Sequence, residues 1–125
     1  MPIDATQPYD DNNIFARILR GEIPSKKVFE DEHVLAFHDI NPLSRTHILE
    51  IPKGSYVSWD DFSAKASDKE IAAFVRAVGA IARDSGLVEP GYRVLANTGL
   101  NAGQEVPHLH VHIFGGGPLG TMLAR

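Results

Sequence analysis

His108, His110 and His112 stand at every second position near the end of the chain, separated by Leu109 and Val111. Side chains of a β-strand alternate between its two faces. The segment therefore predicts a strand with three imidazoles on one face and apolar residues on the other. Same-face positions lie roughly 6.5 to 7 Å apart, so neighbouring imidazoles can orient one another and approach one small ligand together.

The size and composition of the chain predict one compact domain. It has 125 residues, of which 43% are hydrophobic and 22% are charged, as is usual for a soluble globular protein. Residues 1–9 are polar and lack periodicity, so we expect a flexible N-terminal tail followed by a single domain over residues 10–125. No apolar run is long enough to span a bilayer, and the first residues do not resemble a signal peptide. We therefore expect a cytoplasmic protein without membrane partners.

Charge and cysteine content narrow the possible partners. The net charge is −4 and Lys and Arg do not cluster, which argues against a nucleic-acid surface. The chain has no cysteine, so a metal site would have to use histidine and carboxylate ligands. A small phosphorylated ligand remains compatible, because backbone amides can bind phosphate locally.

Local patterns predict two helices and five strands. Asn12 or Asn13 can cap a short helix that ends at Gly21, and the capping box of Ser67 and Glu70 begins a long helix that ends at Gly86. The predicted strands cover residues 26–30, 33–39, 46–51, 92–96 and 108–114. This order predicts an α+β fold in which helices cover one face of a five-stranded antiparallel sheet.

The connection over residues 97–105 is rich in glycine and amide side chains and leads directly into the histidines. Its backbone N–H groups can surround an anion. Three interpretations of the histidines follow: core or edge residues with structural roles, a metal site, or a nucleophilic site in which His110 attacks phosphorus between two supporting imidazoles. The amide-rich loop favours the nucleophilic site. Glu105 is the only carboxylate near the histidines along the chain.

The histidine segment resembles the signature of the histidine triad (HIT) superfamily. Further segments resemble its Hint branch, the histidine triad nucleotide-binding proteins of bacterial type, in order and at matching spacing over nearly the whole chain after the tail. These segments include Ile14-Phe15, Arg20-Gly21-Glu22-Ile23-Pro24-Ser25, Ala36-Phe37-His38-Asp39-Ile40, Thr46-His47, Ile51-Pro52-Lys53 and Gly103-Gln104-Glu105-Val106.

The resemblance implies a HIT-like fold whose sheet continues across a homodimer. It also implies a purine nucleoside phosphoramidase, which hydrolyses adenosine 5′-phosphoramidates to AMP and an amine without a metal or cofactor. His110 matches the nucleophile that forms a nucleotidyl-histidine, and His112 matches the residue that contacts the phosphate and the leaving group. His108 and His47 match the two supporting histidines.

The resemblance also assigns the residues that bind the substrate. Asp39 matches the position that binds the ribose hydroxyls. The base pocket corresponds to Phe15, Ile18, Phe37, His38 and Ile40, and the phosphate lining to Asn97, Gly103, Gln104 and Glu105. Phe15, Ile18 and Phe37 also have the spacing of ordinary core residues.

Two other functions remain open at this level. One is hydrolysis of dinucleoside polyphosphates, and the other is a nucleotide-binding regulatory module with little turnover. The presence of His112 disfavours the nucleotidyltransferase branch of the superfamily, which has glutamine there. The chain departs from animal relatives at Glu105, where they have a hydroxyl residue. Pro107 stands where an aromatic residue is frequent in the family, and it costs the strand a ladder donor.

Overall fold

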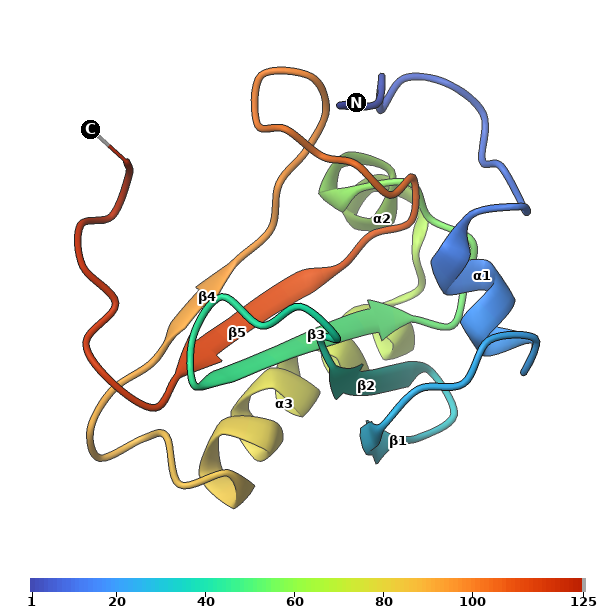
Figure 1. The fold of residues 1–125 in the computed structure, drawn as a ribbon. Helices are drawn as coiled ribbons and strands as arrows, with labels where there is room; N and C mark the ends of the chain where they lie inside the picture. Colours follow the sequence, from blue (N-terminus) through green and yellow to red (C-terminus); the bar gives the residue numbers. More distant parts are fainter. Residues whose placement is uncertain (125) are drawn as a thin grey trace.

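A five-stranded antiparallel sheet organises the chain in the computed structural model, which describes residues 1–124. The strands lie in the order β1-β2-β3-β5-β4, so β5 is inserted between β3 and β4 (Figure 1). The strands are β1 Lys27–Glu30, β2 Val34–His38, β3 Thr46–Pro52, β4 Arg93–Leu95 and β5 Val111–Gly115, and the helices are α1 Ile14–Leu19, α2 Trp59–Lys65 and α3 Asp68–Asp84. The predicted α+β class and sheet are thereby confirmed.

The main core lies between α3 and one face of the sheet. Ser67 and Glu70 form the predicted capping box at the start of α3, and Phe74 and Ile81 on this helix are buried. They pack in one cluster with Ile48 of β3 and residues of β2 and β5. This face therefore fixes β3 and β5 as neighbours, as seen in Figure 1.

The opposite face of the sheet is covered by α1, so the prediction that helices cover only one face is wrong. Asn13 caps α1 by accepting a hydrogen bond from the Ala16 N–H. Phe15 then packs with Phe37, Leu49 and other residues that alternate along β2 and β3 with those of the main core. Four of the five residues of β2 are buried, which is typical of a strand covered on both faces.

The short helix α2 is not predicted by the sequence patterns. Ser58 accepts a hydrogen bond from the Asp60 N–H, and the Asp61 carboxylate accepts one from the Ser58 N–H. This capping box uses aspartate where glutamate or glutamine is more usual. The helix buries Phe62 against the main core.

The last strand begins later than the sequence pattern predicts. Ladder pairing in β5 starts at Val111, so His108 and His110 precede the paired strand. Pro107 has no N–H to donate, and the Leu109 N–H donates to the Tyr56 carbonyl instead of to a neighbouring strand. Alternation nevertheless persists, because Leu109 and Val111 lie in the main core.

Glu50 is the most unusual residue in the core. Its side chain is fully buried on β3, between Ala36 of β2 and Val111 of β5 in the ladder. Neither carboxyl oxygen has a hydrogen-bond partner among residues 1–124. Burial raises the pKa of Glu50 to about 9, so this carboxyl group is protonated at neutral pH.

Within residues 1–124, no helix combines the length and the apolar character needed to cross a membrane.

Candidate active site

A cavity of about 640 Å³ opens on the face of the sheet that carries α1. All ten predicted substrate-binding residues line it: Phe15, Ile18, Phe37, His38, Asp39, Ile40, Asn97, Gly103, Gln104 and Glu105. His110 and His112 line it as well, whereas His108 and His47 contact these two imidazoles from outside the lining. The fold therefore brings the predicted site residues together around one space.

His110 presents a free ring nitrogen. Its Nδ1 lies 2.8 Å from the backbone carbonyl oxygen of His108. A carbonyl only accepts hydrogen bonds, so Nδ1 carries the proton and Nε2 keeps its lone pair. The ring packs edge-on against Phe15, with centroids 4.9 Å apart. Burial lowers the pKa of His110, which favours the neutral, nucleophilic imidazole.

His112 is held in the complementary tautomer. The Leu43 N–H donates to Nδ1 of His47 over 3.1 Å, so His47 carries its proton on Nε2. That Nε2–H donates to Nδ1 of His112, 2.9 Å away. His112 therefore carries its own proton on Nε2. Burial lowers the pKa of His112 to about 4, and it remains a neutral donor at physiological pH.

Asp39 lies beside this hydrogen-bonded pair. Its Oδ2 lies 3.5 Å from Nε2 of His47, and its Oδ1 accepts a hydrogen bond from the Asn41 N–H. The ligand atoms of Asp39, His47 and His112 lie within 4.8 Å of one another, a spacing that suits a metal ion. The proton on Nε2 of His47 occupies the lone pair that a metal would need, so the geometry favours a hydrogen-bonded chain.

His108 is fully buried and is bonded at both ring nitrogens. Its Nε2 lies 2.8 Å from the Pro52 carbonyl oxygen, and its Nδ1 lies 2.6 Å from the hydroxyl of Tyr9. Burial lowers its pKa to about 4. Tyr9 belongs to the segment predicted as a tail, and no spacing pattern in the sequence links it to His108, 99 positions away.

Gln104 organises the loop before the histidines. Its buried side chain accepts a hydrogen bond from the Gly99 N–H and donates to the carbonyls of Val57 and Val106. The side-chain amide of Gln104 therefore stabilises the loop through these three hydrogen bonds. Gly103 adopts a positive φ of 71°, which residues with a Cβ rarely accept.

The predicted base-pocket residues differ in exposure. Phe15 and Phe37 are buried and contact each other edge-on, so they belong to the core and line the cavity at once. Ile40 is 85% exposed at the rim, and His38 and Glu105 are also exposed. A ligand in the cavity would therefore meet a rigid aromatic floor and an open edge.

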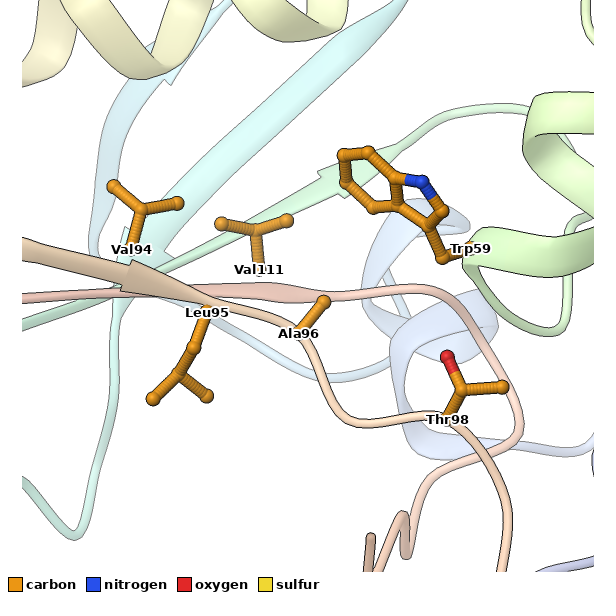
Figure 2. Close-up of a pocket in the computed structure, with 6 residues that line it drawn as sticks. All are labelled: Trp59, Val94, Leu95, Ala96, Thr98 and Val111. Atoms are coloured by element: carbon orange, nitrogen blue, oxygen red, sulfur yellow. The ribbon is translucent and has the colours of Figure 1, made fainter. Parts of the chain in front are cut away.

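A smaller hollow of about 420 Å³ lies at the edge of the sheet formed by β4. Figure 2 shows Trp59, Val94 and Val111 on one side of β4 and β5, with Leu95 pointing to the other side. Trp59 and Val94 are 46% and 44% exposed. This hollow has no titratable lining residue and lies apart from the histidines that line the larger cavity.

Comparison with known proteins identifies the family of the chain. The model of the HIT domain matches residues 20–119. A HIT-like protein of Azospirillum brasilense is 65% identical over 117 residues, which cover 94% of this chain and 96% of the relative. The purine nucleoside phosphoramidase of Escherichia coli is 43% identical over 115 residues, covering 92% of this chain and 96% of that enzyme.

Solved structures show the same fold. A histidine triad protein from Clostridium difficile superimposes with a TM-score of 0.81 at 41% identity, covering 93% of this chain and all of that one. A HIT family hydrolase from Legionella pneumophila gives a TM-score of 0.78 at 38% identity, covering 87% of this chain and 96% of the hydrolase. The chain belongs to the HIT domain family.

Proposed function

We propose that the protein is a purine nucleoside phosphoramidase that releases AMP and an amine from adenosine 5′-phosphoramidates. One observation carries the proposal: Nε2 of His110 is unprotonated, and its neighbour His112 carries a proton on Nε2 in the same cavity. A nucleophile and a proton donor thus lie side by side, with ring centroids 5.2 Å apart. The similarity to the phosphoramidase of E. coli supports this activity.

The reaction divides into two displacements at the α-phosphorus. In the first, Nε2 of His110 forms a bond to phosphorus, the phosphorus–nitrogen bond breaks, and the amine leaves with the Nε2 proton of His112. In the second, water adds its hydroxyl to phosphorus and its proton returns through the same imidazole. AMP leaves and His110 regains its lone pair. The hydrogen bond from Nδ1 of His110 to the His108 carbonyl stabilises the positive charge on the nucleotidyl-imidazole.

The lining supports a nucleotide as the substrate. Phe15 and Phe37 offer an aromatic surface for a purine, and the Asp39 carboxylate in the same lining can accept hydrogen bonds from vicinal ribose hydroxyls. The N–H groups of Gly103 and Gln104 donate within the loop to the carbonyls of Leu100 and Gly99, while Gly103 and Glu105 line the cavity. Charge on the exposed Glu105 side chain repels phosphate, so we assign the contact at this position to its backbone.

Removal of the nucleophile tests the proposal. Wild-type protein should release AMP from an adenosine phosphoramidate without added metal, and His110→Ala should lower kcat by about 1,000-fold or more while nucleotide binding is retained. Mass spectrometry of wild-type protein quenched at alkaline pH, where a phosphorus–nitrogen bond persists, should detect the nucleotidyl adduct on His110. His33→Ala is the matched control, because His33 lies outside the cavity lining.

Full activity in His110→Ala would exclude this mechanism. Loss of wild-type activity with a chelator, restored by Zn²⁺, would favour a metal site at Asp39, His47 and His112. A diadenosine polyphosphate assayed in parallel distinguishes phosphoramidate hydrolysis from the dinucleoside alternative.

We also propose that two copies pair through β4, so that the sheet continues across a homodimer. Within residues 1–124, β4 pairs with β5 alone and forms an edge of the sheet, and the exposed Val94 and Trp59 beside it line an apolar hollow suited to burial.

A further inference from the structure

Tyr9 is bound to the first histidine of the triad. Its hydroxyl lies 2.6 Å from Nδ1 of His108, and the two rings meet edge-on at 68°. Nε2 of His108 faces the Pro52 carbonyl, which only accepts, so Nε2 is protonated and Nδ1 is the acceptor. The Tyr9 hydroxyl is therefore the donor. Burial raises the pKa of Tyr9, which keeps this donor protonated.

The backbone of His108 links this contact with Tyr9 to His110, the proposed nucleophile. The carbonyl of His108 accepts the Nδ1–H of His110 over 2.8 Å, and this bond sets both the tautomer and the direction of the His110 ring. The position of the carbonyl depends on how firmly the His108 ring is held. Tyr9 and Pro52 hold that ring from opposite edges.

The N-terminal segment makes a second bond to the same part of the chain. The Ile3 N–H donates to the carbonyl of Gln104 over 2.7 Å, four residues before His108. The segment thus contacts the histidine region at Gln104 and at His108. Both contacts lie on the connection that carries the cavity lining from Gly103 to His110.

We propose that Tyr9 is a positioning residue that orients the nucleophile His110 through His108. Loss of its hydroxyl leaves a buried ring nitrogen without a donor, and the His108 ring can then relax away from the geometry that fixes its carbonyl. The kinetic consequence rests on the proposed phosphoramidase activity. The structural consequence, a looser Nδ1–H bond on His110, does not depend on it.

The test compares Tyr9→Phe with Tyr56→Phe. Each substitution removes one tyrosine hydroxyl hydrogen bond, but that of Tyr56 goes to Glu70. Tyr9→Phe should lower kcat for an adenosine phosphoramidate about tenfold and change KM less than twofold, since it misaligns the reacting group without touching the cavity lining. Tyr56→Phe should leave both constants within twofold of the wild type.

Nitrogen and proton NMR of the histidines provides the second readout. In Tyr9→Phe, Nδ1 of His108 should shift towards the value of an imidazole nitrogen without a donor, and the Nδ1–H of His110 should exchange with water several-fold faster. Neither change should occur in Tyr56→Phe. An unchanged kcat together with unchanged His110 exchange in Tyr9→Phe would overturn the proposal.

Equal loss of kcat in both variants would also overturn it, because the effect would then reflect general destabilisation. If the wild type shows no turnover, the proposed function fails, and the exchange rate of the His110 Nδ1–H alone decides whether Tyr9 positions this ring.

Discussion

Single hydrogen bonds to the backbone determine which ring nitrogen carries the proton in His110 and in His47. A carbonyl from His108 fixes the proton of His110 on Nδ1, and an N–H from Leu43 fixes that of His47 on Nε2. The hydrogen bond from Nε2–H of His47 to Nδ1 of His112 then places the proton of His112 on Nε2. Two backbone groups therefore make neighbouring imidazoles chemically different, although the sequence presents them as equivalent members of one alternating pattern.

His47 should act mainly on the chemical step. His47→Phe retains an aromatic ring beside Phe114 but removes the donor to His112, whose proton can then move to Nδ1 and away from the leaving group. We expect kcat to fall about tenfold or more, with a smaller change in KM. Steady-state kinetics with an adenosine phosphoramidate measures this split.

The control for His47→Phe is His33→Phe, which replaces a histidine outside the cavity lining. A fall in kcat of the same size in both variants, or a change confined to KM, would contradict the assigned role of His47.

At the scale of elements, β3 contributes alternate residues to the hydrophobic clusters on the two faces of the sheet. Leu49 and Ile51 pack with α1, whereas Ile48 packs with α3. Glu50 lies in the same strand with its carboxyl group buried and unpartnered within residues 1–124. The strand thus combines a face that borders the cavity with a face that contains an unfavourable polar group.

Glu50 should make stability depend on pH. Its pKa is about 9 in the folded protein and near the ordinary value of 4.5 when unfolded. Between these values the folded state binds the extra proton, so the free energy of unfolding falls as pH rises towards about 9. Glu50→Val should raise Tm by about 5 °C at pH 8 and by less at pH 5.

Thermal unfolding at both pH values measures the effect, and Glu89→Val, which changes an exposed glutamate, serves as the control. A gain in Tm for Glu50→Val that is the same at pH 5 and pH 8 would show that Glu50 does not titrate as described.

The sequence predicted elements better where their signals are local. The capping box of Ser67 and Glu70 and the cap at Asn13 both begin helices as expected. The helix α2 was missed because its seven residues offer too short a period and its capping box uses Asp61. The start of β5 was placed too early because alternation continues through Leu109, although backbone pairing there is made with Tyr56.

Contacts between segments that lie far apart along the chain could not be predicted from local sequence patterns. The bond between Tyr9 and His108 joins positions 99 apart, and only the folded path of the chain brings them together. The Leu43 N–H reaches His47 because of a turn between β2 and β3, which side-chain periodicity does not describe. The resemblance to the Hint branch supplied residues such as Asp39 and Asn97, which the structure places around one cavity.

For the whole molecule, the two edges of the sheet differ. β1 forms one edge and carries Lys27 and Glu30, an exposed ion pair. β4 forms the other edge, beside Trp59 and Val94. Charges discourage pairing at an edge strand, and exposed apolar residues favour it. The asymmetry supports the proposed pairing through β4.

A charge on β4 should separate the proposed homodimer. Val94→Arg places a cation on the exposed edge, and two copies facing each other would repel and lose apolar burial. Light scattering should give the wild type about twice the 13.7 kDa chain mass and the variant about one chain mass. Lys27→Glu at the opposite edge should remain dimeric, and an unchanged mass for Val94→Arg would argue against this interface.

The composition of the cavity lining has a consequence for selectivity among the anions of a cell. Within residues 1–124, no lysine or arginine lines the cavity, and two acids, Asp39 and Glu105, do. Inorganic phosphate and sulfate therefore find no concentrated positive charge there. Under the proposed function, an anion is retained only when its shape matches the fixed directions of neutral imidazole and amide donors and a purine fills the aromatic floor. Abundant small anions should then compete only weakly with an adenosine phosphoramidate.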